Sequence, residues 1–318
     1  MLWGTLLFSA EVTLPVCLLI FLGWFLKKQQ CIDDHFVSTA SWLVFHWGMP
    51  ALLFTSVMNL KADTLLDPDI ILFFVIATIL GFLSSAWLAR SLGVALSDHS
   101  AFIQGAARAN LAIVGMAFAG NLYSLEGIAL VSLLVAFLVP LYNVLSVFVL
   151  SYFSGQNREV RFRWPQFWRD LVKNPLIMAI VIAAVCRLIG WDLPNVVDKV
   201  GRYMAQITLP LALICIGGSL QLQNFAQTRF STFWSSAHKI VLMPLIGVPV
   251  AWLLGFRGSE LGVLFLALSC PTAAASFVMT KTMGGNAGLA ANIIAVSTMA
   301  SMVVTALGVF SLKMMSLI

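Results

Sequence analysis

Two short stretches of this 318-residue chain place polar side chains and helix-breaking residues inside apolar sequence. The first contains Arg108, Asn110 and Gly115, and the second reads Cys270-Pro271-Thr272 and continues to Ser276. A guanidinium binds carboxylates, and an amide offers both donors and an acceptor. Where a helix restarts after a proline, its free N–H groups and its dipole favour an anion. The two stretches together predict a binding site for a small organic anion, formed by Arg108, Asn110, Gly115, Pro271, Thr272 and Ser276.

These residues also have a purely structural interpretation. Arg108 can lie in a polar vestibule and pair with a carbonyl group or with Asp98, and Asn110 can satisfy backbone groups that an unwound helix leaves free. A charged side chain at the centre of a membrane helix costs about 2.5–3.5 kcal/mol on insertion scales. Arg108 should therefore face a partner or a water-filled cavity, and the sequence leaves both interpretations open.

Other ionisable residues inside apolar sequence are sparse. Glu11 and His46 are possible protonation sites that couple transport to an ion gradient, and His238 and Lys239 lie within another apolar segment. Each of these four can instead reach the polar interface or form a hydrogen bond between helices. The lack of a deeply placed pair of aspartates argues against a sodium/proton antiporter.

The composition is that of an integral membrane protein. The chain is 60% hydrophobic and 10% charged, with a mean hydropathy of +0.97, whereas soluble domains carry about 25% charged residues. Apolar stretches of roughly 20 residues predict helices and not the short alternating strands of a barrel. The net charge of +5 is assigned to cytoplasmic loops, so no nucleic-acid partner is expected. The five cysteines include no CxxC motif and form no cluster with histidine, so we expect neither metal nor cofactor.

We expect ten membrane spans in an all-α fold, and a first helix that is not cleaved, because Lys27 and Lys28 follow the first apolar run. The predicted spans are 8–26, 38–58, 69–91, 101–120, 126–152, 174–190, 196–219, 232–255, 260–281 and 287–312. They form a first five-helix repeat (1–153) and a second, inverted one (174–318), joined by a basic, aromatic cytoplasmic loop (154–173).

The distribution of Lys and Arg predicts the orientation. With the N-terminus outside, ten of the eighteen basic residues fall in cytoplasmic loops, six fall outside, and Arg108 and Lys239 remain within spans. Because cytoplasmic loops are enriched in basic residues, both termini are predicted to lie on the periplasmic side of the inner membrane.

An internal repeat supports the division into two halves. Helix-breaking or small residues recur at offsets of 160, 161, 164 and 161, in the pairs Pro50/Pro210, Asn110/Pro271, Gly120/Gly284 and Gly127/Gly288. Because five is an odd number of spans, the second half is inverted relative to the first. Inverted repeats with interrupted helices at matching positions are typical of secondary transporters, whose sites lie near the midplane at the breaks.

The order of these motifs resembles the auxin efflux carrier family of membrane permeases, which includes plant auxin carriers and bacterial malate and malonate permeases. The resemblance covers essentially the whole chain. It rests on Pro50, Asn110 with Gly115, Asn174-Pro175, Pro210 with Gly217-Gly218, the segment 239–244, Cys270-Pro271-Thr272, and Ser297-Thr298 with Ser301. The family commonly has a proline two residues after the span-four glycine, where this chain has Ala117. Arg108 is not part of the family pattern and suggests a strongly anionic substrate such as a dicarboxylate.

The resemblance implies a carrier of small organic anions that works by an elevator-like motion. It implies a scaffold of spans one, two, six and seven, through which family members often form homodimers, and a mobile domain in which spans four and nine cross. One alternative is a sodium-coupled symporter of the bile-acid-carrier type, and another is a membrane sensor or scaffold that does not transport. An enzyme is not expected, because four scattered histidines supply no catalytic constellation.

Overall fold

The computed structural model describes the chain except for residues 1, 59–67, 154–172, 174, 192 and 221–224. In the described part the regular structure is helical, and one isolated bridge, between Ala109 and Thr272, is the exception. Six helical segments are long and apolar enough to cross a membrane, which confirms an all-α membrane protein. They are Asp34–Thr55, Pro68–Ser91, Leu111–Phe153, Asn195–Ser219, Phe225–Leu253 and Ala287–Met314.

Helices occupy most of every range predicted as a span, although the ten-span inverted repeat itself stays a prediction. In the first half these are α1 (Leu2–Lys28), α2 (Asp34–Leu43), η1 (Val44–Gly48), α3 (Met49–Met58), α4 (Pro68–Ser91), η2 (Leu96–Asp98), α5 (His99–Ala107), η3 (Leu111–Gly115) and α6 (Met116–Phe153). The backbone of α6 leaves helical geometry at Tyr123 and Ser124, where Ser124 has φ +54°, so the predicted spans four and five meet there.

The second half begins after the central loop, which apart from Lys173 lies outside the described residues. Its helices are α8 (Pro175–Leu188), α9 (Asn195–Ser219), α10 (Phe225–Ala237), η4 (His238–Leu242), α11 (Met243–Leu253), α12 (Gly258–Ser269), α13 (Ala275–Thr282) and α14 (Ala287–Met314). The division into two repeats at this loop remains a prediction.

Two of the long segments contain a π-helical turn just before a proline. The turn η1 precedes Pro50, and η4 precedes Pro244. A proline has no N–H, and its ring clashes with the carbonyl four residues earlier. A wider turn relieves that clash, and such turns are frequent at functional sites. In η4 the turn contains the adjacent basic residues His238 and Lys239.

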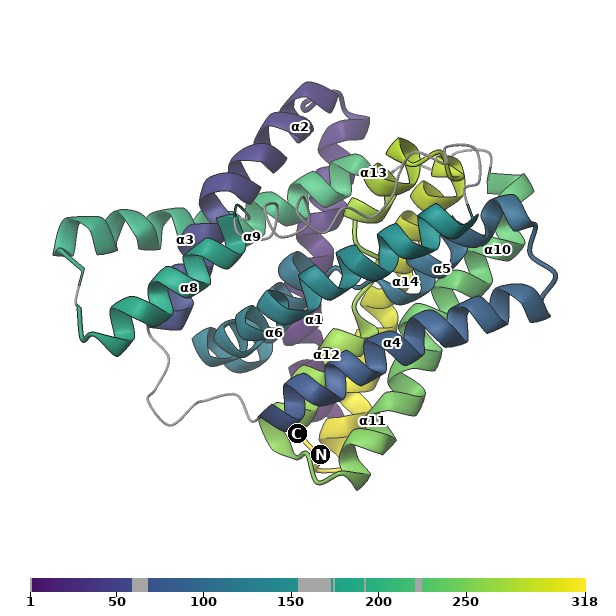
Figure 1. Ribbon diagram of the computed structural model, residues 1–318. Helices are drawn as coiled ribbons and strands as arrows, with labels where there is room; N and C mark the ends of the chain where they lie inside the picture. The colour runs from purple at the N-terminus through teal and green to yellow at the C-terminus, as the bar shows by residue number, and fades with distance from the viewer. Residues whose placement is uncertain (1, 59–67, 154–172, 174, 192, 221–224) are drawn as a thin grey trace.

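The helices form two groups (Figure 1). On one side α3 packs against α8 and α9, and α2 and α1 pack against α9. On the other side α4 and α10 pack against α5, and α11 packs against α12. Between them run α6 and α14, which contact members of both groups. The interrupted pairs α5/η3 and α12/α13 lie where the two groups meet.

Candidate functional site

The two helix breaks found in the sequence face each other and are joined by backbone hydrogen bonds. The Asn110 N–H donates to the Pro271 carbonyl (2.8 Å), and the Ala273 N–H donates to the Arg108 carbonyl (3.1 Å). These bonds form the antiparallel bridge between Ala109 and Thr272. Backbone groups freed inside a membrane must find partners within the protein. Each break therefore supplies part of what the other lacks.

Thr272 and Gly115 hold this crossing together. The Thr272 hydroxyl donates to the Gly105 carbonyl (2.6 Å), and the Thr272 N–H donates to the Ser297 hydroxyl on α14 (3.1 Å). At Gly115 an added Cβ would lie 2.7 Å from Leu111 Cδ1 and 3.0 Å from Cys270 Sγ. The threonine thus ties the second break to α5, and the glycine lets the two breaks approach closely.

Arg108 is buried, with 6% of its surface exposed, and its described polar partners are neutral. Its Nη2 donates to Asn143 Oδ1 (2.8 Å), and its Nη1 lies 3.4 Å from Ser146 Oγ and 2.7 Å from Met279 Sδ. Asp98, the carboxylate partner considered from the sequence, instead accepts a hydrogen bond from Asn286 Nδ2 (2.8 Å). These contacts hold the guanidinium in place without neutralising its charge.

A cavity of about 650 Å³ lies beside the first break. Arg108 and Asn110 line it on one side, and Ala273, Ala274 and Ala275 bring the start of α13 to it. The Ser276 and Phe277 N–H groups in this first turn already donate to the Ala273 and Ala274 carbonyls (2.9 and 3.1 Å), and the attraction for an anion comes from the helix dipole, which makes this end positive. Helices α2, η1, α8 and α9 supply the opposite wall, through side chains such as Ser41, Phe45, Leu176 and Ala212. The cavity can therefore hold an anion between the two helix groups.

A small ionic cluster lies beside this cavity, between the predicted first and second spans (8–26 and 38–58). Asp34 lines the cavity and forms an ion pair with Lys27 (2.7 Å). The neighbouring Asp33 caps α2 by accepting a hydrogen bond from the Phe36 N–H (2.7 Å), and this bond lowers the pKa of the Asp33 carboxyl. The cavity thus opens near the predicted cytoplasmic end of the first two spans.

The predicted site residues are brought together at the crossing, but not all of them reach the cavity. Arg108 and Asn110 line it, whereas Gly115, Pro271, Thr272 and Ser276 are not among its lining residues. Ser276 is 1% exposed, and its hydroxyl has no hydrogen-bond partner in the part of the chain that is described. It lies in the first turn of α13, one residue after Ala275.

The two possible coupling residues lie away from the crossing. His46 is exposed on η1, where its Nδ1 contacts the Trp42 carbonyl (3.0 Å) and its ring stacks on Trp42. Glu11 is exposed on α1. The coupling role of either residue remains a prediction.

Several residues of the site were not predicted from the sequence. Asn143 and Ser146 hold Arg108, and their spacing of three residues on α6 is the signal that could have identified them, since such residues share a helix face. The sequence predicted that His238 and Lys239 on η4 would reach the polar interface or form a hydrogen bond to a neighbouring helix, and both residues bond to neighbouring helices. His238 Nδ1 contacts the Ala106 carbonyl (3.0 Å), and Lys239 Nζ donates to the Leu268 carbonyl (2.7 Å). These two carbonyls lie in the last turns of α5 and α12, just before each break.

Fold and site together define a helical, multi-pass membrane protein with paired helix breaks beside an internal cavity. A family model described as membrane transport protein, the auxin efflux carrier family, matches residues 8–309, and the chain belongs to this family of membrane transporters. It is 25% identical over 299 residues to an uncharacterised transporter of Methanothermobacter thermautotrophicus, covering 93% of this chain and 95% of the relative.

Two further relatives carry similar descriptions. An uncharacterised transporter of Methanocaldococcus jannaschii is 23% identical over 313 residues, with 93% of this chain and 96% of the relative covered. One of Escherichia coli is 20% identical over 295 residues, with 88% and 92% covered. The resemblance to the auxin efflux carrier family is thereby confirmed, and the protein is a membrane transporter.

Proposed function

We propose that this transporter carries a small organic anion, a mono- or dicarboxylate such as malate, across the inner membrane by an elevator-type movement. The observation that carries the proposal is the charge of Arg108. This buried guanidinium lines the cavity and has only neutral partners among the described residues. A buried charge is costly unless it is compensated, and a carboxylate is the ligand that a guanidinium binds best.

The start of α13 adds a second attraction for an anion. Ala274 and Ala275 are exposed to the cavity and lie in the first turn of this helix or just before it. The positive end of a helix dipole at one break and a positive side chain at the other suit a ligand with two separated anionic groups. This arrangement supports a dicarboxylate in preference to a monocarboxylate.

The division of the helices supports the elevator mechanism. One wall of the cavity comes from α2, η1, α8 and α9, and the other comes from the two breaks with α6 and α13. We assign the first group to a fixed scaffold, which also forms the homodimer contact, and the second to a moving domain. A ten-span inverted repeat with both termini periplasmic is the topology that this assignment requires.

Replacement of Arg108 by Gln tests the proposed function. The purified variant should bind [14C]malate about 100-fold more weakly than the wild type, because the charge attraction and one arm of the hydrogen-bonding fork are lost. Arg108→Lys keeps the charge without the fork and should fall between the two. Binding is measured by scintillation proximity, and [14C]malonate and [14C]acetate are compared under the same conditions.

Protein quality and uptake complete this test. Each variant is checked by size-exclusion chromatography in detergent, and uptake is measured in proteoliposomes. If Arg108→Gln elutes normally and binds each carboxylate that the wild type binds with unchanged affinity, then Arg108 is not the anion site.

A further inference from the structure

A second buried basic side chain, the imidazole of His238, lies on the other side of the first break. It is 5% exposed and bridges two helices, because its Nδ1 contacts the Ala106 carbonyl (3.0 Å) and its Nε2 contacts Ser84 Oγ on α4 (3.0 Å). Ala106 is two residues before Arg108. The end of α5 therefore joins His238 directly to the proposed anion site.

The hydrogen bonds around His238 accommodate both of its charge states. A carbonyl only accepts, so Nδ1 carries a hydrogen toward Ala106 in either state. In the neutral imidazole, Nε2 accepts the hydroxyl hydrogen of Ser84. When a proton from water binds Nε2, the new N–H donates to Ser84 Oγ, and the hydroxyl hydrogen turns to the Gly81 carbonyl, which lies 3.2 Å from Ser84 Oγ. Ser84 is thus a relay that satisfies either state.

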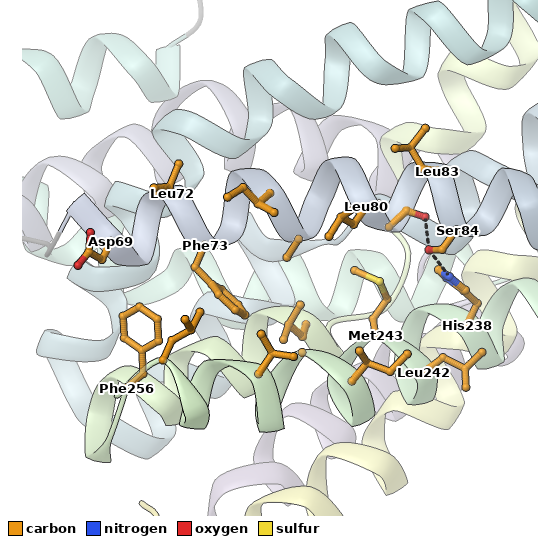
Figure 2. A pocket seen from close by; sticks show the side chains of 18 of the residues that line it. Asp69, Leu72, Phe73, Leu80, Leu83, Ser84, His238, Leu242, Met243 and Phe256 are labelled. Carbon is orange, nitrogen blue, oxygen red and sulfur yellow. Dashed lines mark hydrogen bonds between the residues drawn. The ribbon is translucent and has the colours of Figure 1, made fainter.

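The His238 imidazole lines a different cavity from the one beside Arg108. Ser84 and His238 lie together at one end of a cavity of about 880 Å³ between α4 and α11, and Asp69 lies at the other end (Figure 2). This cavity shares no lining residue with the one beside Arg108. A proton at His238 and an anion at Arg108 would therefore occupy opposite sides of the end of α5.

The charges around His238 set the direction of the effect. Described elements packed against η4 include α4, through Ser84, and α5, α10, α11, α12 and α14. Their charged or titratable side chains, with those at the two breaks, are Asp69, Arg90, His99, Arg108, Arg229, Glu260, Cys270 and Lys313. Asp69 and Glu260 line the same cavity as His238, and Arg90 and Arg229 are exposed. His99 begins α5, and Lys313 is in the last turn of α14.

Two basic side chains are linked to His238 through the chain and through its contact with Ala106. Lys239 is adjacent in the chain, with its ammonium directed to Leu268, and Arg108 follows the carbonyl that His238 contacts. An anion bound at Arg108 offsets one of these charges, so it favours a proton on His238. By reciprocity, a proton on His238 favours the anion by the same factor.

From this geometry we propose that His238 is a proton-binding site, with Ser84 as its relay, and that its proton is carried together with the anion. The second part rests on the proposed function as a carboxylate carrier, whereas the first does not. Couplings of this kind typically change affinity by about 5- to 150-fold. The transporter would then be a proton–anion symporter, in which the anion and the proton are bound on either side of one helix end.

The first test needs no substrate. The four histidines of the chain give four imidazole signals in a 15N-histidine-labelled sample, assigned with single His→Asn variants. His238 should titrate between pH 5 and pH 8, and addition of malate should move its midpoint upward. Failure of His238 to titrate in this range overturns the proton site. Titration without any carboxylate binding leaves the proton site standing and refutes the proposed function.

The second test is flux in proteoliposomes. An inward proton gradient should raise wild-type [14C]malate accumulation, and His238→Asn, whose amide can still donate to Ala106, should lose that rise. Malate–malate exchange in the same vesicles, weaker than in the wild type but above that of protein-free vesicles, shows that the variant still carries substrate. Ser84→Ala should lose part of the gradient-driven rise in accumulation. Replacement of the exposed His35 by Gln is the matched control. A role for His238 in coupling is refuted if malate accumulation by His238→Asn still depends fully on the proton gradient. It is also refuted if His46→Gln, and not His238→Asn, loses that dependence.

Discussion

The two helix breaks differ in how they are made and in what they offer to a ligand. The break between α12 and α13 is made by Pro271 and small residues, and its polar groups are used to join the helices, as Thr272 does with Gly105 and Ser297. The break between α5 and η3 has no proline, and it places Arg108 and Asn110 on the cavity wall. The comparison shows one break that builds the crossing and another that carries the charge.

The basic residues of η4 add to this comparison. His238 contacts the carbonyl end of α5, and Lys239 donates to the carbonyl end of α12. A cation near a helix C-terminus complements the dipole there. Lys239, with 1% of its surface exposed, donates to the second break, whereas His238 bonds to the first break through an imidazole, a group that changes its charge near neutral pH. The same π-helical turn thus contacts the first break through an imidazole and the second through a lysine amine.

The largest effect is expected from Asn143→Asp, which places a carboxylate 2.8 Å from the Arg108 guanidinium without changing the side chain's shape. The internal ion pair should compete with the substrate and weaken malate binding by about 100-fold or more. Isothermal titration calorimetry measures this, with the exposed Asn121→Asp as the control. Malate binding that survives Asn143→Asp unchanged would mean that the first break does not carry the charge selectivity.

Thr272→Val should affect stability more than binding, because Thr272 lies outside the cavity lining. It leaves the Gly105 carbonyl without its hydroxyl partner, and a lost buried hydrogen bond costs about 1–3 kcal/mol. Thr272→Ser keeps the hydroxyl and should lose less. Chemical unfolding in detergent gives the free energies. A Thr272→Val protein of wild-type stability that binds malate poorly would place Thr272 in the anion site instead.

Ser276→Ala separates two roles for a hydroxyl that is buried at the start of α13. Its oxygen has no partner among the described residues, so its removal breaks no hydrogen bond there and should leave the free energy of unfolding unchanged or higher. Malate affinity should stay within about threefold of wild type, which corresponds to less than 1 kcal/mol. A drop of tenfold or more in that affinity would show that Ser276 reaches the ligand.

The smallest effect is expected from replacing sodium by N-methylglucamine. The Lys239 amine already donates to the Leu268 carbonyl at the end of α12 (2.7 Å), and a bound sodium ion would otherwise use this oxygen as a ligand. Malate uptake should change by less than twofold, at fixed pH and membrane potential. Strong sodium dependence would favour the alternative of a sodium-coupled symporter.

Much of the site was predictable because membrane insertion makes polar residues and prolines conspicuous. Arg108 and Pro271 stand out against apolar sequence, and both lie at the crossing. Asn143 and Ser146 were not recognised, because a single amide or hydroxyl in a long helix usually bonds to a neighbouring helix and gives no sign of its partner. The role of Gly115 was predicted as ligand contact, whereas in the structure it permits close approach to Cys270.

The sequence by itself determined that the protein is helical and embedded in a membrane, that the motifs match the auxin efflux carrier family, and that two helices are interrupted. These properties follow from the local composition and from the spacing of residues along the chain, and neither depends on which helices pack against each other. Only the tertiary structure decided that the breaks bond to each other, that Arg108 has neutral partners, and that η4 contacts the ends of both half-helices. These contacts join different helices, at separations from 29 positions (Lys239 with Leu268) to 132 positions (His238 with Ala106) and more, so they depend on how the helices pack, and no local pattern encodes them.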